Sequence, residues 1–280
     1  MSKLITIPSS IDEVNETKTL VDGYIIGIKD MCVNSNFNIE DLSILNEFSD
    51  KDIFINLNKN ILESEIDKVR EILIDLNNYN IKGVLFYDIG ILNIYNKLNL
   101  KYDLIISQEH ALTNTATVNY WCANGIKCAY LSSDITINEV SEIKKSSDCK
   151  VMVNLFGYLP MFVSRRHIVK NYLDYFKLDD NSSINYIEKE GAIYPIIDNN
   201  VGTQVYSGNI LNGIKYSLIN LDYIVLNSFN IDLDKFIDVI KMFISVNEKN
   251  ILEYDDKINN MFPNVDYGFL ERKTIYKVGK

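Results

Sequence analysis

Short apolar runs that end in polar residues recur along this chain, and each is followed by a segment with helical spacing. The runs predict strands at 4–8, 24–28, 52–58, 82–87, 104–107, 127–131, 149–155 and 223–227. The predicted helices lie at 11–20, 38–48, 64–76, 89–98, 113–123, 138–145, 210–220 and 232–246. Strands and helices that alternate in this way are typical of right-handed crossovers and a parallel sheet.

Eight such units in 280 residues favour an α/β fold of the (β/α)8 TIM-barrel type, closed or nearly closed. Several predicted helices are short, which predicts an irregular barrel. Between units seven and eight, residues 164–208 interrupt the alternation with a predicted β-hairpin, whose turn is Glu188–Gly191, and a further strand at 203–207. Residues 262–280 form a tail with a strand-like run at 273–278. We therefore predict a single domain over residues 1–280.

The length of the apolar runs and the net charge limit where this protein can be located and what it can bind. No apolar run approaches the roughly 20 residues that span a bilayer, and the segment Met1–Pro8 is too short for a signal peptide. We therefore expect a cytoplasmic protein without membrane contact. The net charge of −10 does not favour direct nucleic-acid binding, because phosphate contacts need Lys and Arg. A local basic patch remains compatible with this balance.

The four cysteines contain no CxxC pair: they are Cys32, Cys122, Cys128 and Cys149. We expect buried free thiols, with Cys122 packed in the core from the middle of a helix. A metal or cluster site drawn from all four stays open, because distant positions can converge, but their spacing gives it no support. We expect no metal site. The GxSxG, HExxH, P-loop and GxGxxG patterns are also absent from the sequence, so nucleophilic catalysis has little support.

The residues that follow the predicted strands would form the site face of a barrel. They are polar and mostly uncharged, which suits a neutral or weakly anionic small ligand. His110 is the candidate acid–base group, with Asp134 as its candidate partner. The alternative is a histidine at a helix start that only hydrogen-bonds the backbone. The predicted ligand-binding residues of this face are Asn56, Gln108, Ser132 and Asn154.

Arg165 and Arg166 are the strongest anion-binding signal in the sequence. Two guanidinium groups at the mouth of a barrel can hold a carboxylate or a phosphate. Ser164 would cap the helix that follows and place free N–H groups beside the arginines. The alternative is a solvated helix start in which the arginines pair with Asp174 or Asp179.

Several segments resemble the peptidase U32 family, in the order in which that family has them. They are Ser107–Asn114, Asn119–Cys122, Leu131–Asp134, Asn154–Arg166, Gly202–Ser207, Gly268–Leu270 and Lys273–Val278. They cover the chain from about the fifth strand to the end, while the first hundred residues match only in the order of elements. The chain is most similar to a short Gram-positive subgroup of this family.

The resemblance implies a role that the residues alone do not. Members of the subgroup work with a longer relative and are linked to prephenate-dependent hydroxylation of the wobble uridine of tRNA. The family name implies proteolysis, including collagenase activity. The wider family holds an iron–sulfur cluster on cysteines that would fall in and after Phe156–Ser164, where this chain has none, and its His-Gly pair is Phe156-Gly157 here. We therefore expect no cluster and no other evident cofactor.

Three hypotheses follow. In the first, the chain is a subunit of the tRNA hydroxylation system that binds a carboxylate such as prephenate, with Arg165 and Arg166 as anion clamps and a partner that supplies most of the tRNA contact. In the second, it is a peptidase that uses His110 and Asp134 as an acid–base pair. In the third, it is a non-catalytic scaffold subunit.

Overall fold

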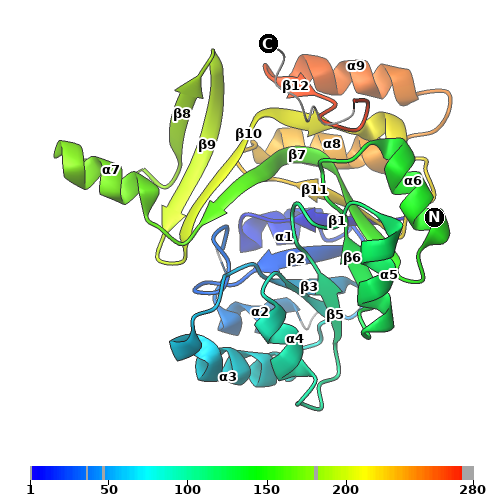
Figure 1. The fold of residues 1–280 in the computed structure, drawn as a ribbon. Helices are drawn as coiled ribbons and strands as arrows, with labels where there is room; N and C mark the ends of the chain where they lie inside the picture. Colours follow the sequence, from blue (N-terminus) through cyan, green and yellow to red (C-terminus); the bar gives the residue numbers. More distant parts are fainter. Residues whose placement is uncertain (1, 36, 46–47, 180–181, 273–280) are drawn as a thin grey trace, which may run out of the picture.

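A computed structural model describes residues 2–35, 37–45, 48–179 and 182–272 of the chain. Its centre is a closed ring of eight parallel strands with helices around it (Figure 1), which confirms the predicted barrel. The strands of the ring are β1 (Lys3–Ile7), β2 (Gly23–Gly27), β3 (Asp52–Leu57), β4 (Gly83–Phe86), β5 (Asp103–Ile106), β6 (Cys128–Tyr130), β7 (Lys150–Ser164) and β11 (Tyr223–Asn227). The ring closes because β11 pairs with β1 on one side and with β7 on the other.

Helices follow the strands of the ring and cover its outside. They are α1 (Ile11–Thr17), η1 (Ile39–Asp41) with α2 (Leu42–Leu45), η2 (Glu63–Glu65) with α3 (Ile66–Leu76), α4 (Ile89–Tyr95), α5 (Thr115–Ala123), α6 (Ile137–Ser146), α8 (Leu233–Ser245) and α9 (Ile251–Met261). The predicted helix at 38–48 is thus short and begins as a 3-10 turn, and residues 46–47 of it lie outside the described residues. Many helices are short, as the sequence predicts. In the described part of the chain, no helix has the length and apolar character needed to cross a membrane.

The strands fill the barrel by simple alternation. One side chain from nearly every strand points inward, including Ile5, Ile25, Phe54, Leu85 and Ile105. The intervening residues, such as Leu4, Ile26 and Ile53, point outward into a larger core beneath the helices. Because the described interior of the ring is packed with side chains, a ligand does not fit inside it, and the carboxyl ends of the strands are where barrels of this type bind ligands.

An extension leaves the ring where β7 continues past its barrel segment (Figure 1). Its elements are α7 (Ile168–Phe176), β8 (Asn185–Lys189), β9 (Ala192–Asn199) and β10 (Gly202–Asn212), and β7, β10, β9 and β8 form an antiparallel sheet in that order. The predicted hairpin is therefore present as β8 and β9. The predicted helix at 210–220 is wrong, because Ile210 and Leu211 pair with β7 and with β12 (Val265–Asp266), which leaves only the 3-10 turn η3 (Ile214–Tyr216). The predicted strand at 273–278 lies outside the described residues.

Gly157 marks the point at which β7 passes from the barrel to the extension. Its φ of +107° is in the region that favours glycine, and the register between β7 and β11 shifts beside it. A Cβ atom added here would lie 2.2 Å from the carbonyl oxygen of Asn227. The turn therefore needs a residue without a side chain.

We expect Gly157→Ala to lower the free energy of unfolding by about 3 kcal/mol or more, because the added methyl group meets backbone on a neighbouring strand of the ring. Urea unfolding followed by circular dichroism measures this change. Gly191→Ala is the matched control: Gly191 also has positive φ, +79°, but nothing lies within 4 Å of its added Cβ. The Gly191→Ala variant should lose about 1 kcal/mol of the free energy of unfolding. Equal losses for the two variants would contradict the steric explanation.

Candidate functional site

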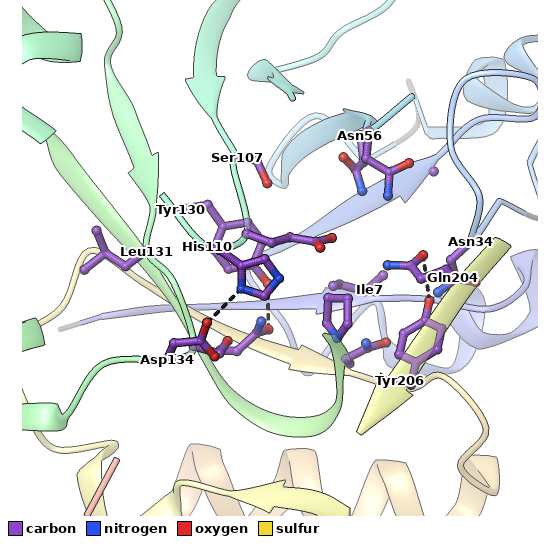
Figure 2. A pocket seen from close by; sticks show the side chains of 17 residues that line it. Ile7, Asn34, Asn56, Ser107, His110, Tyr130, Leu131, Asp134, Gln204 and Tyr206 are labelled. Carbon is purple, nitrogen blue, oxygen red and sulfur yellow. Dashed lines mark hydrogen bonds and ion pairs between the residues drawn. The ribbon is translucent and has the colours of Figure 1, made fainter. Parts of the chain in front are cut away.

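A polar pocket opens at the carboxyl ends of the barrel strands (Figure 2). Its open space is about 800 Å³, including the part that is continuous with solvent. Residues from most strands of the ring and from β10 surround it, so distant segments of the sequence meet here. The polar residues that line it are Asn34, Asn56, Asn58, Ser107, Glu109, His110, Tyr130, Ser133, Asp134, Asn154, Gln204, Tyr206 and Asn227.

His110 and Asp134 form a close pair at the edge of this pocket, as Figure 2 shows. The Nδ1 atom of His110 lies 2.7 Å from Oδ2 of Asp134, and the two residues follow β5 and β6. Burial alone lowers the pKa of His110, but the hydrogen bond and charge of Asp134, aided by the charge of Glu109 and a hydrogen bond to the Met161 backbone, raise it more, so the net pKa is above the ordinary value. A charged imidazolium that points one nitrogen at a carboxylate can donate a proton from the other.

Glu109 adds a second carboxyl group to the pocket. Burial raises its pKa above the ordinary value, the charge of His110 opposes this, and the charge of Asp134 adds to it. None of the described residues that line the pocket is Lys or Arg. The pocket therefore favours a neutral ligand over an anion.

Amide side chains dominate the rest of the lining. Asn154 accepts a hydrogen bond of 2.6 Å from the Tyr130 hydroxyl, and Gln204 accepts one of 3.2 Å from Tyr206. The buried Oδ1 atom of Asn56 has no hydrogen-bond partner among the described residues, and its Nδ2 atom has only the sulfur of Cys32 at 3.5 Å. A buried acceptor without a partner is costly, so Asn56 is poised to accept a hydrogen bond from a ligand.

Tyr206 gives the pocket an aromatic side. Its ring stacks on Phe229 with 3.9 Å between the centroids, and its side chain is almost fully buried. The expectation that site residues follow the strands of the barrel did not predict Gln204 or Tyr206, because both come from the extension. The sequence did contain a signal for both residues, because they lie in the segment Gly202–Ser207, which carries part of the family resemblance. Glu109 and Asn34 were also missed.

The two predicted arginines do not line the pocket. The extra length of β7 carries them beyond the mouth, where Nη2 of Arg165 lies 3.6 Å from Glu65. Arg166 is exposed, and its carbonyl accepts a hydrogen bond from Thr203. Asp174 pairs with Lys170 instead of an arginine. Ser164 accepts a hydrogen bond from the Arg166 amide, but α7 begins after His167 without a side-chain cap.

Two further predicted residues lie just outside the lining. The Nε2 atom of Gln108 donates to the carbonyl of Tyr87 at 3.1 Å, so it joins the ends of β4 and β5. Ser132 is buried and accepts a hydrogen bond from the amide of Asp134 at 3.1 Å. Ser132 therefore positions Asp134, while His110, Asp134, Asn56 and Asn154 meet in the pocket as the sequence predicts.

The cysteines correct another expectation. Cys122 and Cys149 form a disulfide, with 5.7 Å between their Cα atoms, because α5 and the start of β7 are neighbours. Cys32 and Cys128 are buried free thiols, as expected, and Cys128 points into the barrel interior. The four sulfurs therefore do not converge, and the residues 156–164 contain no cysteine, so the chain does not fit the cluster of the wider family. Within the described residues, no group of three His, Cys, Asp or Glu side chains could hold a metal ion.

The pKa of His110 gives a direct test of the pair with Asp134. The chain has two histidines, so the variant His167→Gln leaves one imidazole signal to follow by NMR as pH changes. We expect a pKa above the ordinary 6.5 for His110, and a lower one after Asp134→Asn, because the carboxylate stabilises the imidazolium. An unchanged His110 pKa in the Asp134→Asn variant would contradict the pairing.

Comparisons with known proteins agree with this fold. The tRNA hydroxylation protein P2 of Bacillus subtilis (strain 168) is 24% identical over 269 residues, which cover 86% of this chain and 87% of that protein. An uncharacterized protease of Methanocaldococcus jannaschii is 24% identical over 189 residues, which cover 62% of this chain and 46% of that protein. The solved structure of the U32 peptidase Mk0906 has the same fold, with a TM-score of 0.52, 8% identity and coverage of 81% of this chain and 92% of that one. The profile of peptidase family U32 matches residues 26–182, more than half of the sequence, and the chain therefore belongs to peptidase family U32.

Proposed function

We propose that this protein acts in the cytoplasm as a subunit of the prephenate-dependent system that hydroxylates the wobble uridine of tRNA, and that its pocket takes the uracil base. The similarity to a tRNA hydroxylation protein over most of both chains supports a role in this system. The observation that carries the proposal for the pocket is its lining, in which amides surround a His–Asp pair and no described lining residue is Lys or Arg.

The lining suits a flipped base on chemical grounds. Uracil presents alternating carbonyl acceptors and one N–H donor, and primary amides can pair with both. The unpartnered Oδ1 atom of Asn56 would accept from the N–H group. Enzymes that modify bases extrude them into pockets that combine such hydrogen bonds with aromatic contact, which Tyr206 can supply. His110 and Asp134 would then hold or move a proton beside the ring.

The carboxylate is assigned to another part of the system. The predicted anion clamp depended on Arg165 and Arg166, neither of which lines the pocket, and Glu109 and Asp134 would repel an anion there. We therefore assign prephenate to the longer U32 relative with which this chain would assemble. The same partner would supply most contacts to the tRNA phosphates, since this chain carries a net charge of −10.

Deletion of the gene, followed by mass spectrometry of digested tRNA, tests the function. We expect the hydroxylated wobble uridine to fall, and to return when the wild-type chain is expressed again. An unchanged level in the deletion strain would rule out the proposed function, provided that the deletion is confirmed and no second short U32 protein is expressed.

Peptide hydrolysis is the second candidate, because the 2.7 Å His110–Asp134 pair could activate a water molecule. Incubation of the purified protein with unfolded and collagen-like substrates, with and without divalent metals, tests it. Cleavage that is lost in His110→Ala would favour this candidate, while the absence of cleavage would count against it.

A further inference from the structure

We propose that a groove beside the pocket holds the nucleotide next to the flipped uridine in the RNA strand, with its phosphate on Arg272 and its base on an aromatic surface. This inference rests on the proposed function and adds a second binding site to it. The groove has an open space of about 1110 Å³, including the part that is continuous with solvent. His110, Asp134 and Pro160 line both the groove and the pocket, so the two cavities meet at the His–Asp pair.

The groove forms where β10 changes its neighbour along one edge. Up to Val205 this edge pairs with β9, and from Ile210 it pairs with β12. The pairing of β10 with β7 on the other edge is irregular over the same stretch, with register shifts on both sides of Tyr206. The residues 207–209 therefore line an open space between β9 and β12, to which β9 contributes Tyr194 and β12 contributes Asp266.

The groove offers the two kinds of contact that a nucleotide in a single strand needs. Tyr194 and Phe269 line it and are partly exposed, and aromatic side chains stack on bases with little regard to sequence. Arg272 also lines the groove, with its guanidinium carbon 5.8 Å from the centre of the Phe269 ring. Arg272 is exposed and belongs to no ion pair within the described residues, so its guanidinium group can bind a phosphodiester.

The carboxylates near Arg272 already have partners. Asp266 accepts hydrogen bonds from one side-chain amide at 3.0 Å and from one backbone amide at 2.9 Å. Asp134 is held in the His–Asp pair. Glu271 lines a different cavity and accepts a hydrogen bond of 2.7 Å from the Tyr216 hydroxyl. Among the charged residues described in the groove, Arg272 is therefore the one that is available to an anionic ligand.

A second cavity next to the pocket is less suited to the strand. It shares Asn34 with the pocket and extends to the end of β9 and the start of α8. Its charged residues within the described part of the chain are Glu13 and Asp198, and none of its described residues is Lys or Arg. Carboxylates would repel a phosphodiester there. A uridine inside a strand has a phosphate on each side of it, so the groove with Arg272 is the favoured path for the neighbouring nucleotide.

Photocrosslinking with two kinds of probe separates this inference from the proposed function. One tRNA carries 4-thiouridine at the wobble position and others carry it at either adjacent position, each in extract that contains the tagged chain and its partners. We expect the wobble probe to label pocket peptides, and one adjacent probe to label the tryptic peptide Ile258–Arg272, which contains Phe269 and no residue of the pocket lining. Adjacent probes that do not label this peptide, while the wobble probe labels the pocket, would overturn the groove alone. A wobble probe that labels no pocket peptide would overturn both proposals.

Substitution of Arg272 tests the phosphate contact. In a strain without its own copy of this protein, Arg272→Gln should form the hydroxylated uridine about 10-fold more slowly than the wild-type chain, because one charge-assisted contact to the strand is lost. Arg272→Lys, which keeps the charge, should restore most of the rate. Arg70→Gln, at an exposed position of α3 outside both cavities, is the matched control and should stay within about 2-fold of wild type. A rate for Arg272→Gln as high as that for Arg70→Gln would overturn the contact.

Discussion

In a strain without its own copy of this protein, the His110→Ala chain is expected to form the hydroxylated uridine at least about 100-fold more slowly than the wild-type chain, the usual loss when a group that moves a proton is removed. His110 faces the pocket, and its Nδ1 atom is held 2.7 Å from Asp134, so it is the lining residue best suited to donate a proton near neutral pH. Mass spectrometry of tRNA at intervals after induction measures the rate and avoids the saturation that hides slow activity at late times.

His167→Ala provides the matched control for this experiment. His167 also has its Nδ1 atom near an aspartate, Asp198 at 3.2 Å, but it lies in the extension and does not line the pocket. Its loss should leave the rate within about 3-fold of wild type, as expected of a partly exposed pair of small energetic value. If His110→Ala were as active as His167→Ala, the pocket would not be the reacting site, and the scaffold hypothesis would gain support.

The second large effect is expected in the pH dependence of stability, and it depends on Glu13. Only 4% of this residue is exposed. Its Oε2 atom accepts hydrogen bonds of 2.8 Å from the Ser9 amide and the Ser228 hydroxyl, while Oε1 has no partner within the described residues. Burial raises the pKa of Glu13 from 4.5 to about 7, and the two hydrogen bonds oppose this rise.

The sign of the effect follows from the protons bound in each state. Between pH 4.5 and about 7, the folded chain keeps a proton that the unfolded chain has lost, so stability falls as pH rises through this window. Between pH 5 and pH 8 the cost is about 2.5 kcal/mol. Glu13→Gln keeps the shape and both accepted hydrogen bonds but cannot ionise, so it should lose this dependence.

Urea unfolding at pH 5 and pH 8 measures the difference between the wild-type chain and the variant. Glu16→Gln, at an exposed position of the same helix, is the control and should behave as wild type. The same pH dependence in wild type and Glu13→Gln would show that another group is responsible.

The barrel could be predicted from the sequence because each strand depends on local information. A run such as Ile53–Leu57 is apolar, ends in polar residues and is followed by a periodic helix, and the ring then closes by pairing of neighbours. The start of α1 is local in the same way, because the Ser10 hydroxyl accepts a hydrogen bond from the amide of Glu13, three residues further on. The rule that polar residues after strands form the site identified His110, Asp134, Asn56 and Asn154.

The errors come from interactions between segments that are distant in sequence. The arginines were placed at the mouth because β7 was expected to end near Leu155, but pairing with β10 extends it to Ser164. The same pairing made strand of the start of the predicted helix at 210–220, up to Asn212. Helix α9 was not predicted, and the Cys122–Cys149 pair has 27 residues of separation and no local signature.

The proposed function requires that the pocket at the barrel mouth receive the wobble uracil of tRNA. The most direct measurement is photocrosslinking with tRNA that carries 4-thiouridine at the wobble position, in extract that contains the tagged chain and its partners. We predict crosslinked peptides that contain His110, Tyr130 or Tyr206. Crosslinks confined to peptides outside the pocket would contradict the claim.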